Sequence, residues 1–316
     1  MAVGSRPLVP SRLAPAGVLH RAHSTRRTPA SVFGAYVALT KPRIIELLLV
    51  TTVPTMVLAE RGWPPLGLVL VTLVGGTLSA GGANAINMYV DRDIDALMER
   101  TRQRPLVTGV IAPRDALVFA LVLEAVAFVV LLVGANTLAA VLALAAAAFY
   151  VLVYSLWLKR TSRHNIVVGG AAGAVPVLVG WAAVSGSLGW APIVLFIAMF
   201  LWTPPHFWAL AIRYADDYRA ADVPMLPAVA PLDAAARQMV GYTAALFATT
   251  LILVPVADLG WIYTVAAVAL GLGFLGATVA LVRTPTPSMS MTVFTYSITY
   301  VTVLFGALMV DVLVLG

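Results

Sequence analysis

The sequence has no cysteine and few charged residues. None of the 316 residues is cysteine, which excludes disulfides, cysteine-bound iron–sulfur clusters and the covalent attachment of heme through a CxxCH motif. Only 11% of the residues are charged, whereas 61% are hydrophobic. Soluble domains carry roughly 25% charged residues, and so few charges cannot cover this much apolar surface in water. A compact soluble enzyme is therefore excluded, as is a disordered or fibrous chain.

The apolar residues fall in nine segments that are each long enough to cross a lipid bilayer. These segments are 44–60, 66–90, 116–134, 137–157, 166–186, 189–211, 239–257, 260–282 and 293–314. Backbone N–H and C=O groups inside a bilayer must pair with one another, which a helix achieves within one segment. Polar and apolar residues do not alternate as in a membrane β-barrel, so each segment is expected to be a helix. The expected fold is all-α, a single bundle of about nine transmembrane helices over residues 36–316.

The basic residues predict the orientation of this bundle. Of the 20 Lys and Arg residues, all but Arg61 lie before the first span or in the loops after the second, fourth, sixth and eighth spans. The positive-inside rule places these segments, and with them the N-terminus, on the cytoplasmic side. The net charge of +6 is explained by topology. The basic residues form no aromatic-rich patch, so no nucleic acid partner is expected.

Residues 1–35 form a basic N-terminal segment rich in Arg, Ala, Ser and Pro. Its prolines interrupt any long helix, so a disordered cytoplasmic tail is expected. A basic segment without acidic residues is also typical of a mitochondrial transit peptide. The mitochondrial inner membrane is therefore an alternative location. The excess of Arg over Lys and the many Ala and Val residues fit a GC-rich bacterial source, and favour a bacterial plasma membrane.

Two acidic clusters follow membrane spans on the predicted cytoplasmic side. Charges beside membrane helices are costly and tend to be functional. The alternative for each cluster is a solvated loop that forms local salt bridges. The first cluster is Asp91, Asp93, Asp95 and Glu99, and the second is Asp216, Asp217 and Asp222.

The first cluster has a helical spacing. Asn87, Asp91 and Asp95 are four residues apart, so a continuing helix places them on one face. Two carboxylates and an amide oxygen form a set of hard oxygen ligands suited to Mg²⁺. Arginine side chains beside such a metal fit a polyanionic ligand such as a diphosphate. Arg102 lies near this face, and Arg100 and Arg104 flank it.

These motifs resemble the UbiA superfamily of intramembrane prenyltransferases, and within it the protoheme IX farnesyltransferases, or heme O synthases. The run NMYVDRDIDALMERTRQRPLVTG at 87–109 is very similar to the signature of that group. Further matches cover the first six spans and their loops. They are LTKPRI at 39–44, YSLWLKRTSRHNIVVGG at 154–170, PPHFWALA at 204–211 and DDYRAADVPMLP at 216–227.

The resemblance implies a reaction and its partners. Farnesyl diphosphate transfers its farnesyl group to a vinyl group of protoheme IX, water adds, and diphosphate leaves with formation of heme O. Heme is then a substrate and Mg²⁺ the cofactor. A downstream heme A synthase is an implied protein partner, in the biosynthesis of heme for terminal oxidases.

The resemblance also implies roles for the acidic residues. Asn87, Asp91 and Asp95 would hold Mg²⁺ on the diphosphate, and Asp217, with Asp216 beside it, would supply a second metal-binding cluster. The wider superfamily has DxxxD at this second site, whereas this sequence has the pair Asp217-Tyr218. Asp222 stands where the resemblance implies glycine or another small or neutral residue.

The basic and aromatic candidates complete the expected site. Arg104 and Lys159 are expected, with Asp91 and Asp95, to act in catalysis by stabilising the leaving diphosphate. Each basic residue has the alternative of serving membrane topology alone. His206, the only histidine within a span, is a candidate to ligate or orient heme iron. The further substrate-binding candidates are Asn87, Lys41, Arg43, Arg100, Arg160 and Tyr154.

Two other functions remain open from the sequence. A quinone-pathway prenyltransferase acting on an aromatic acid has the same fold, although the HFW and DYxxAxVPM blocks speak against it. A membrane transporter would place its acidic residues at the membrane midplane, between inverted repeats. Both acidic clusters instead follow spans on one side, and the chain shows no convincing internal repeat.

Overall fold

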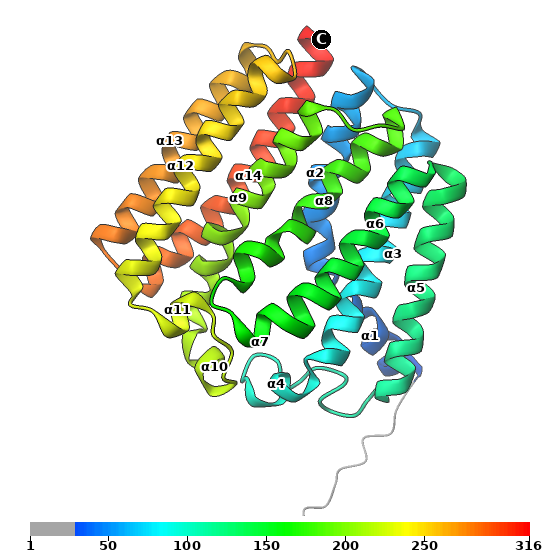
Figure 1. Cartoon of the computed structure of the whole chain (residues 1–316), viewed down its shortest axis with the longest axis vertical. Coiled ribbons are helices and arrows are strands. Elements are labelled where there is room, and N and C mark those ends of the chain that lie inside the picture. The colour runs from blue at the N-terminus through cyan, green and yellow to red at the C-terminus, as the bar shows by residue number, and fades with distance from the viewer. Residues whose placement is uncertain (1–28) are drawn as a thin grey trace, which may run out of the picture.

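The computed structural model describes residues 29–316, with only the backbone described at 29–31, 44 and 46–49. Residues 1–28, most of the expected tail, lie outside the described residues. Within 29–316 every regular element is a helix (Figure 1). The elements are α1 Pro29–Thr40, α2 Pro42–Glu60, α3 Leu66–Val90, α4 Arg92–Leu97, α5 Pro113–Gly134, α6 Thr137–Phe149, the π-helix η1 Tyr150–Leu158, α7 Lys159–Thr161, α8 Asn165–Ser185, α9 Trp190–Arg213, α10 Ala215–Ala220, α11 Leu226–Val229, α12 Leu232–Val256, α13 Trp261–Arg283 and α14 Pro287–Leu315.

The all-helical, membrane-spanning architecture is confirmed. Eight segments of the described chain are long and apolar enough to cross a membrane, namely α3, α5, the continuous run α6–η1–α7, α8, α9, α12, α13 and α14. They match eight of the nine predicted spans. The remaining predicted span, 44–60, forms most of α2, in which several side chains are outside the described set. The protein is therefore a multi-pass membrane protein, and the cytoplasmic position of its N-terminus stays a prediction.

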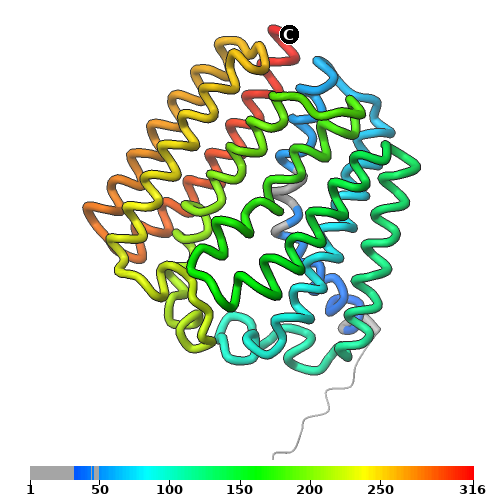
Figure 2. Tube along the Cα trace, viewed as in Figure 1, coloured from blue at the N-terminus to red at the C-terminus, as the bar shows by residue number. Residues whose placement is uncertain are grey.

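The short elements gather at one end of the bundle. Figure 1 shows α1, α4, α7, α10 and α11 at the same end, opposite the C-terminus. Figure 2 shows that the loops after α3, α7 and α9 turn at this end. These are the loops that carry the basic residues and both acidic clusters, so the fold brings the predicted functional loops together.

A helix begins before residue 36, inside the range expected for the tail. Helix α1 starts at Pro29. Ala35 and Leu39 are buried against the same cluster as residues of α3 and α5, and Tyr36 meets Phe119 edge-on at 4.9 Å between ring centres. Through Ala35, Tyr36 and Leu39, α1 therefore packs on the bundle.

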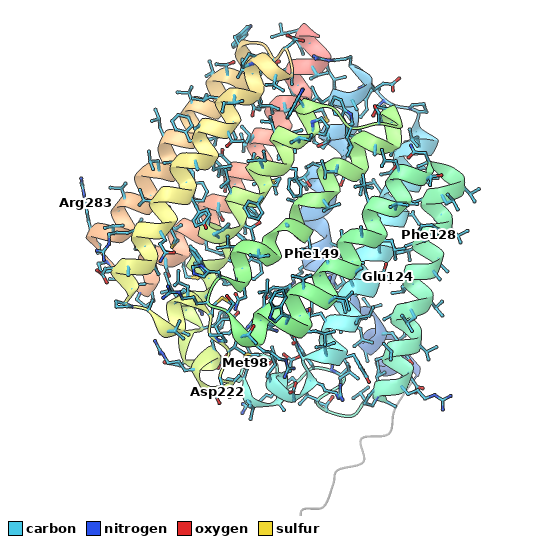
Figure 3. The ribbon with its side chains drawn as sticks, in the orientation of Figure 1. Met98, Glu124, Phe128, Phe149, Asp222 and Arg283 are labelled. Carbon is cyan, nitrogen blue, oxygen red and sulfur yellow. The ribbon has the colours of Figure 1, made fainter. Side chains whose placement is uncertain are left out.

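A buried carboxyl group marks the packing of α3 on α5. Ser79 donates a hydrogen bond of 3.1 Å to Oε2 of Glu124, and both side chains are buried. Gly82 makes room for this side chain, since a Cβ there would lie 2.8 Å from Oε1 of Glu124. Gly75 likewise accommodates Leu131, at 2.5 Å from such a Cβ. Figure 3 labels Glu124 on α5, and the small residues of α3 explain why the two helices lie close.

A carboxylate from α14 stabilises the start of α13. Asp311 accepts hydrogen bonds from the backbone N–H of Gly260 at 2.6 Å and of Tyr263 at 2.9 Å, and it is 2% exposed. Replacing Asp311 with Ala removes the partner of both N–H groups, of which that of Tyr263 is buried. Hydrogen bonds to charged groups contribute about 1.5–3 kcal/mol each. We therefore expect Asp311→Ala to lower the midpoint of thermal unfolding, measured in detergent.

The matched control for this prediction is Asp233→Ala. Asp233 pairs with Arg237 one helical turn away, on an exposed face. Exposed pairs of this kind contribute about 0.5 kcal/mol or less, so the midpoint is expected to change little. Equal midpoints for the two variants would contradict the capping role of Asp311.

Candidate functional site

The predicted acidic motif lies on a nearly continuous helix. Helix α3 ends at Val90 and α4 begins at Arg92, and the hydrogen bonds from Asp91 N to Asn87 O (2.9 Å) and from Asp95 N to Asp91 O (2.8 Å) continue the helical register. This confirms that Asn87, Asp91 and Asp95 share one face. All three are buried, and both aspartates are 0% exposed.

Asp91 is the centre of a polar network. Its Oδ2 accepts hydrogen bonds from Nδ2 of Asn87, at 2.8 Å, and from Nζ of Lys159. Its Oδ1 is fully buried and has no hydrogen-bond partner among the described residues, although Nη2 of Arg160 lies 4.0 Å away. A buried charged oxygen without a partner is costly, so this atom is ready for a further ligand.

Asp95 repeats this arrangement one turn later. Its Oδ2 accepts a hydrogen bond of 2.6 Å from Nη1 of Arg104. Its Oδ1 is also buried and unpaired within the described part of the chain. Thr101 donates a 2.8 Å hydrogen bond to the backbone carbonyl of Asp95, which ties the loop that carries Arg104 to the end of α4. The two aspartates thus each use one oxygen for a cation and leave the other open.

The π-helix η1 positions two partners of this motif. Ser155 donates to the carbonyl of Tyr150, five residues back, at 2.9 Å, and accepts from Nδ2 of Asn87, also at 2.9 Å. Lys159 follows directly at the start of α7 and reaches Asp91. π-helical turns are rare and often occur at functional sites. Neither the π-helix nor the contact of Ser155 was predicted from the sequence.

Lys41 enters the site from the junction of α1 and α2. Its backbone is left-handed, with φ 53°, just before Pro42. Its Nζ donates a 2.8 Å hydrogen bond to Oδ1 of Asn87. Burial, together with the charges of Arg104 and Lys159, lowers the pKa of Lys41 to about 7. Three cationic side chains therefore converge on the motif, and a bound polyanion would offset their mutual repulsion.

Arg160 closes the outer side of the motif. It forms two hydrogen bonds of 2.7 Å with the carboxylate of Asp93 and one of 2.9 Å with the carbonyl of Val90. The hydrogen bonds from Arg160 lower the pKa of Asp93 to about 2. Since the Asp93 side chain is 61% exposed, this pair lies at the surface and holds α4 against α7.

The second acidic cluster supports the loop after α4. Asp217 accepts hydrogen bonds from the backbone N–H of Glu99 (3.3 Å) and Arg100 (3.4 Å), and lies 3.9 Å from the Arg100 guanidinium. Arg100 also donates to the hydroxyl of Tyr218 at 2.8 Å. Asp216 instead points into solvent, with a side chain that is 99% exposed and paired with Arg219.

Asp222 has a conformational role. It is exposed and left-handed, with φ 51°, at the end of α10, where the N–H of Val223 bonds to the carbonyl of Tyr218. This backbone favours glycine but is tolerated by aspartate, which explains the departure noted in the sequence. Figure 3 shows Asp222 at the edge of the bundle.

An apolar cavity of about 220 Å³ lies beside the motif. It is bounded mainly by α3, α6, η1, α8 and α9, and its lining includes Asn84, one turn before Asn87. Tyr150 and Tyr154 both line it and stack with ring centres 5.3 Å apart. Alanine and glycine make up much of the remaining wall. The polar motif thus adjoins a channel that suits an elongated apolar group.

His206 lies in an aromatic environment between α9 and α14. Its ring stacks on Trp202 at 4.1 Å and on Phe294 at 4.8 Å between ring centres, and its Nδ1 lies 2.7 Å from Oγ of Ser297. The Ser297 hydroxyl donates to the carbonyl of Phe294 at 2.6 Å. Nδ1 of His206 must then be the donor to Ser297, which leaves a lone pair on Nε2.

Apart from His206, the predicted residues divide into three groups. The first is the polar network of Asn87, Asp91, Asp95 and Lys159, which are buried, and Lys41 and Arg104, which are partly buried, and Ser155 must be added to it. Arg100, Arg160 and Asp217 surround it, and Tyr154 lines the adjoining cavity. Arg43 and Asp216 are exposed and do not contact the network. Within residues 29–316, no group of three or more His, Cys, Asp or Glu side chains forms a metal cluster by itself.

Comparison with known proteins agrees with this geometry. The model of the UbiA prenyltransferase family matches residues 48–307. Protoheme IX farnesyltransferase from Paenarthrobacter aurescens is 54% identical over 284 residues, which cover 88% of this chain and 89% of that protein. The protein of the same name from Streptomyces coelicolor is 50% identical over 307 residues, covering 94% and 96%.

A solved structure shares the fold. The UbiA homolog from Archaeoglobus fulgidus, bound to DMAPP and Mg²⁺, superposes with a TM-score of 0.62 at 18% identity, covering 85% of this chain and 99% of that one. With a matching family model over most of the chain and relatives that share half of its residues, this membrane-embedded enzyme belongs to the UbiA prenyltransferase family, in the group of the protoheme IX farnesyltransferases.

Proposed function

We propose that this protein transfers the farnesyl group of farnesyl diphosphate to a vinyl group of protoheme IX and so forms heme O. The allylic carbon–oxygen bond breaks and its electron pair leaves with the diphosphate. The π electrons of the vinyl group form a carbon–carbon bond to the allylic carbon. Water adds to the cation that remains on the former vinyl group and loses a proton, which gives the hydroxyl group of the new side chain. The observation that carries the proposal is the pair of buried, unpaired oxygens on Asp91 and Asp95, flanked by cations at an apolar cavity.

The residues of the motif fit Mg²⁺. Oδ1 of Asp91 and Oδ1 of Asp95 are hard oxygen donors without a partner in the described chain. Two carboxylates fall short of a complete coordination shell, so phosphate oxygens of the substrate and water would supply the remaining ligands. Mg²⁺ bound in this way would neutralise charge on the diphosphate. Oδ1 of Asn87 is engaged by Lys41 and would become a ligand only if that hydrogen bond opened.

The cations of the network hold the leaving group. Lys159 and Arg104 each pair with one aspartate through one oxygen. Both would stabilise the negative charge that develops on a diphosphate bound beside these aspartates. Lys41 is the third basic side chain. Burial, together with the charges of Arg104 and Lys159, lowers its pKa to about 7, so its charged form is favoured only by an added counter-charge. Diphosphate binding would supply that charge. We assign Arg100 and Arg160 to the support of this network through Asp217 and Asp93.

The cavity would receive the farnesyl chain. Its wall is mostly apolar, and Tyr150 and Tyr154 line it. An apolar enclosure keeps bulk water from the allylic cation that forms when diphosphate leaves. These side chains therefore have two tasks, to stabilise charge on the diphosphate and to exclude water from the cation. The reaction needs no nucleophilic residue.

His206 is the proposed contact to heme iron. The hydrogen bond to Ser297 fixes the tautomer in which Nε2 has a free lone pair, as metal-bound histidines require. The flat stacks with Trp202 and Phe294 hold the ring in place. We expect His206→Ala to raise the KM for protoheme about tenfold or more, with little change in the KM for farnesyl diphosphate.

The spectrum of bound heme tests this contact. Wild-type protein mixed with ferric protoheme should show a Soret band typical of histidine ligation, and His206→Ala should lose it. The control His164→Ala changes an exposed histidine at the start of α8 and should leave the spectrum unchanged. An unchanged spectrum in His206→Ala would exclude His206 as the ligand.

One assay tests the proposed reaction against its main alternative. Membranes that contain the protein receive Mg²⁺, farnesyl diphosphate and either protoheme IX or 4-hydroxybenzoate. We expect a heme product of higher mass, released diphosphate, and loss of both when EDTA removes the metal. Prenylation of 4-hydroxybenzoate without a heme product would favour the quinone-pathway alternative, and no product with either acceptor would reject transfer to both.

The cellular setting follows from this proposal. The helices place the protein in a lipid bilayer, and the bacterial relatives favour a bacterial plasma membrane over the mitochondrial inner membrane. Heme O is poorly soluble in water, so an enzyme that consumes it, such as a heme A synthase, would benefit from docking beside this protein in the same membrane.

A further inference from the structure

The apolar cavity has a definite length. On α3 its lining runs from Asn84, beside the polar network, to Thr72, a distance of about 18 Å at a rise of about 1.5 Å per residue. On α8 it runs from Ile166 to Val179, about 20 Å by the same rise. An extended isoprenoid has four chain bonds per unit, so three units span about 15 Å and four units about 20 Å at about 1.25 Å per bond.

The glycines of α3 and α8 are of two kinds. Gly75 and Gly170 are packing residues, because a Cβ there would lie 2.5 Å from Leu131 and 2.8 Å from Thr203. Gly76 and Gly173 also line the cavity, but a Cβ at either would meet no described atom within 4 Å. The space beside Gly76 and Gly173 is therefore cavity, and no neighbouring side chain fills it.

The depth of these two positions is informative. Gly76 lies eight residues from Asn84, and Gly173 lies seven residues from Ile166, so both lie about 10–12 Å from the mouth. Two isoprene units of a chain that starts near Asn84 would end at this depth. The third unit would pass between or beyond Gly76 and Gly173.

We propose that Gly76 and Gly173 determine the chain length of the isoprenoid donor by keeping the inner third of the cavity open. The inference rests on the proposed function, because it assigns this cavity to the allylic diphosphate. A leucine at either position would place its branched side chain in the space of the third unit. The altered cavity would take the two units of a geranyl group and exclude the farnesyl group.

The test compares Gly76→Leu and Gly173→Leu with the wild type on geranyl, farnesyl and geranylgeranyl diphosphate, with protoheme as acceptor. A few carbon atoms in a tight apolar pocket change specificity by about 10–200-fold. We expect the ratio of kcat/KM for geranyl over farnesyl diphosphate to rise about 100-fold in each variant. An unchanged ratio, including one in which kcat/KM falls equally for both donors, would overturn the proposal.

Two further variants guard the interpretation. Gly276→Leu changes an exposed helical glycine that also has open space around it in the described structure but lies outside the cavity, and its donor ratio should match the wild type. If the leucine variants do not fold, Gly76→Ala and Gly173→Ala provide the test with a smaller shift in the same direction, and no shift overturns the proposal.

The outcome is separable from that of the proposed function. If the wild type transfers no allylic group to protoheme, the proposed function fails. If the wild type transfers farnesyl and the glycine variants keep the same donor preference, only the assignment of chain length fails. Product masses distinguish the geranyl and farnesyl adducts directly.

Discussion

Asp91→Asn is expected to lower kcat/KM by about 1,000-fold or more while the protein remains inserted in the membrane. Oδ1 of Asp91 is the buried oxygen without a partner, and Oδ2 pairs with Lys159. The substitution keeps the size of the side chain but removes the charge that would bind Mg²⁺ and balance Lys159. The loss of turnover is expected in protein that remains inserted, and the thermal midpoint in detergent should also fall, because Lys159 loses its buried counter-charge.

The control for this prediction is Asp93→Asn, two residues further along the same helical segment. Asp93 is largely exposed, and its pair with Arg160 lies at the surface. We expect its kcat/KM to stay within about threefold of the wild type, since exposed pairs contribute little. Initial rates at saturating Mg²⁺ measure both variants, and near-normal activity of Asp91→Asn would remove the metal role from the motif.

Lys159→Met is expected to have the second-largest effect. Lys159 is 8% exposed, pairs with Asp91, and would contact the diphosphate. Methionine fills the space but removes the cation, so we expect kcat to fall by about 100–1,000-fold. The variant also leaves a buried carboxylate unpaired, which costs about 3–5 kcal/mol in comparable cases, so the thermal midpoint in detergent should fall as well.

Binding of diphosphate separates these two consequences. At high Mg²⁺ and farnesyl diphosphate the bound substrate should restore the midpoint of Lys159→Met in part, because ligand binding stabilises the folded state. The turnover rate should stay low. Arg163→Gln changes an exposed basic residue of the same loop and should match the wild type in both measurements. A kcat of Lys159→Met near that of the wild type would contradict a role in the departure of diphosphate.

The sequence predicted the helices because their signal is local. Long apolar segments and the one-sided distribution of basic residues define most spans without any knowledge of packing. The four-residue spacing of Asn87, Asp91 and Asp95 likewise gave their common face, which the continuing hydrogen bonds of α3 and α4 confirm.

The rest of the site depends on contacts between distant segments. Lys41 reaches Asn87 across 46 residues, and Ser155 reaches it across 68. No periodicity in the sequence predicts such contacts. The residues of the π-helix that positions Ser155 have the same apolar pattern as an ordinary α-helix. The motif around 154–170 supplied the only signal, because it contains Ser155 and Lys159 together.

The second acidic cluster shows a different limit. Asp216 and Asp217 are neighbours in sequence, yet the first is exposed and the second accepts hydrogen bonds from the backbone at 99–100. This difference arises from which way the short helix α10 turns each side chain, whereas Asp222 follows α10 in a left-handed position. That orientation is set by packing against other loops and cannot be read from spacing.

We propose that Asp91 and Asp95 bind the metal of an allylic diphosphate at the mouth of the cavity. A crystal or cryo-electron microscopy structure with Mn²⁺ and a non-hydrolysable farnesyl thiodiphosphate would locate both ligands. We expect metal between the Oδ1 atoms of Asp91 and Asp95 and the diphosphate, with the farnesyl chain between α3 and α8. Metal bound elsewhere, or a farnesyl chain outside this cavity, would contradict it.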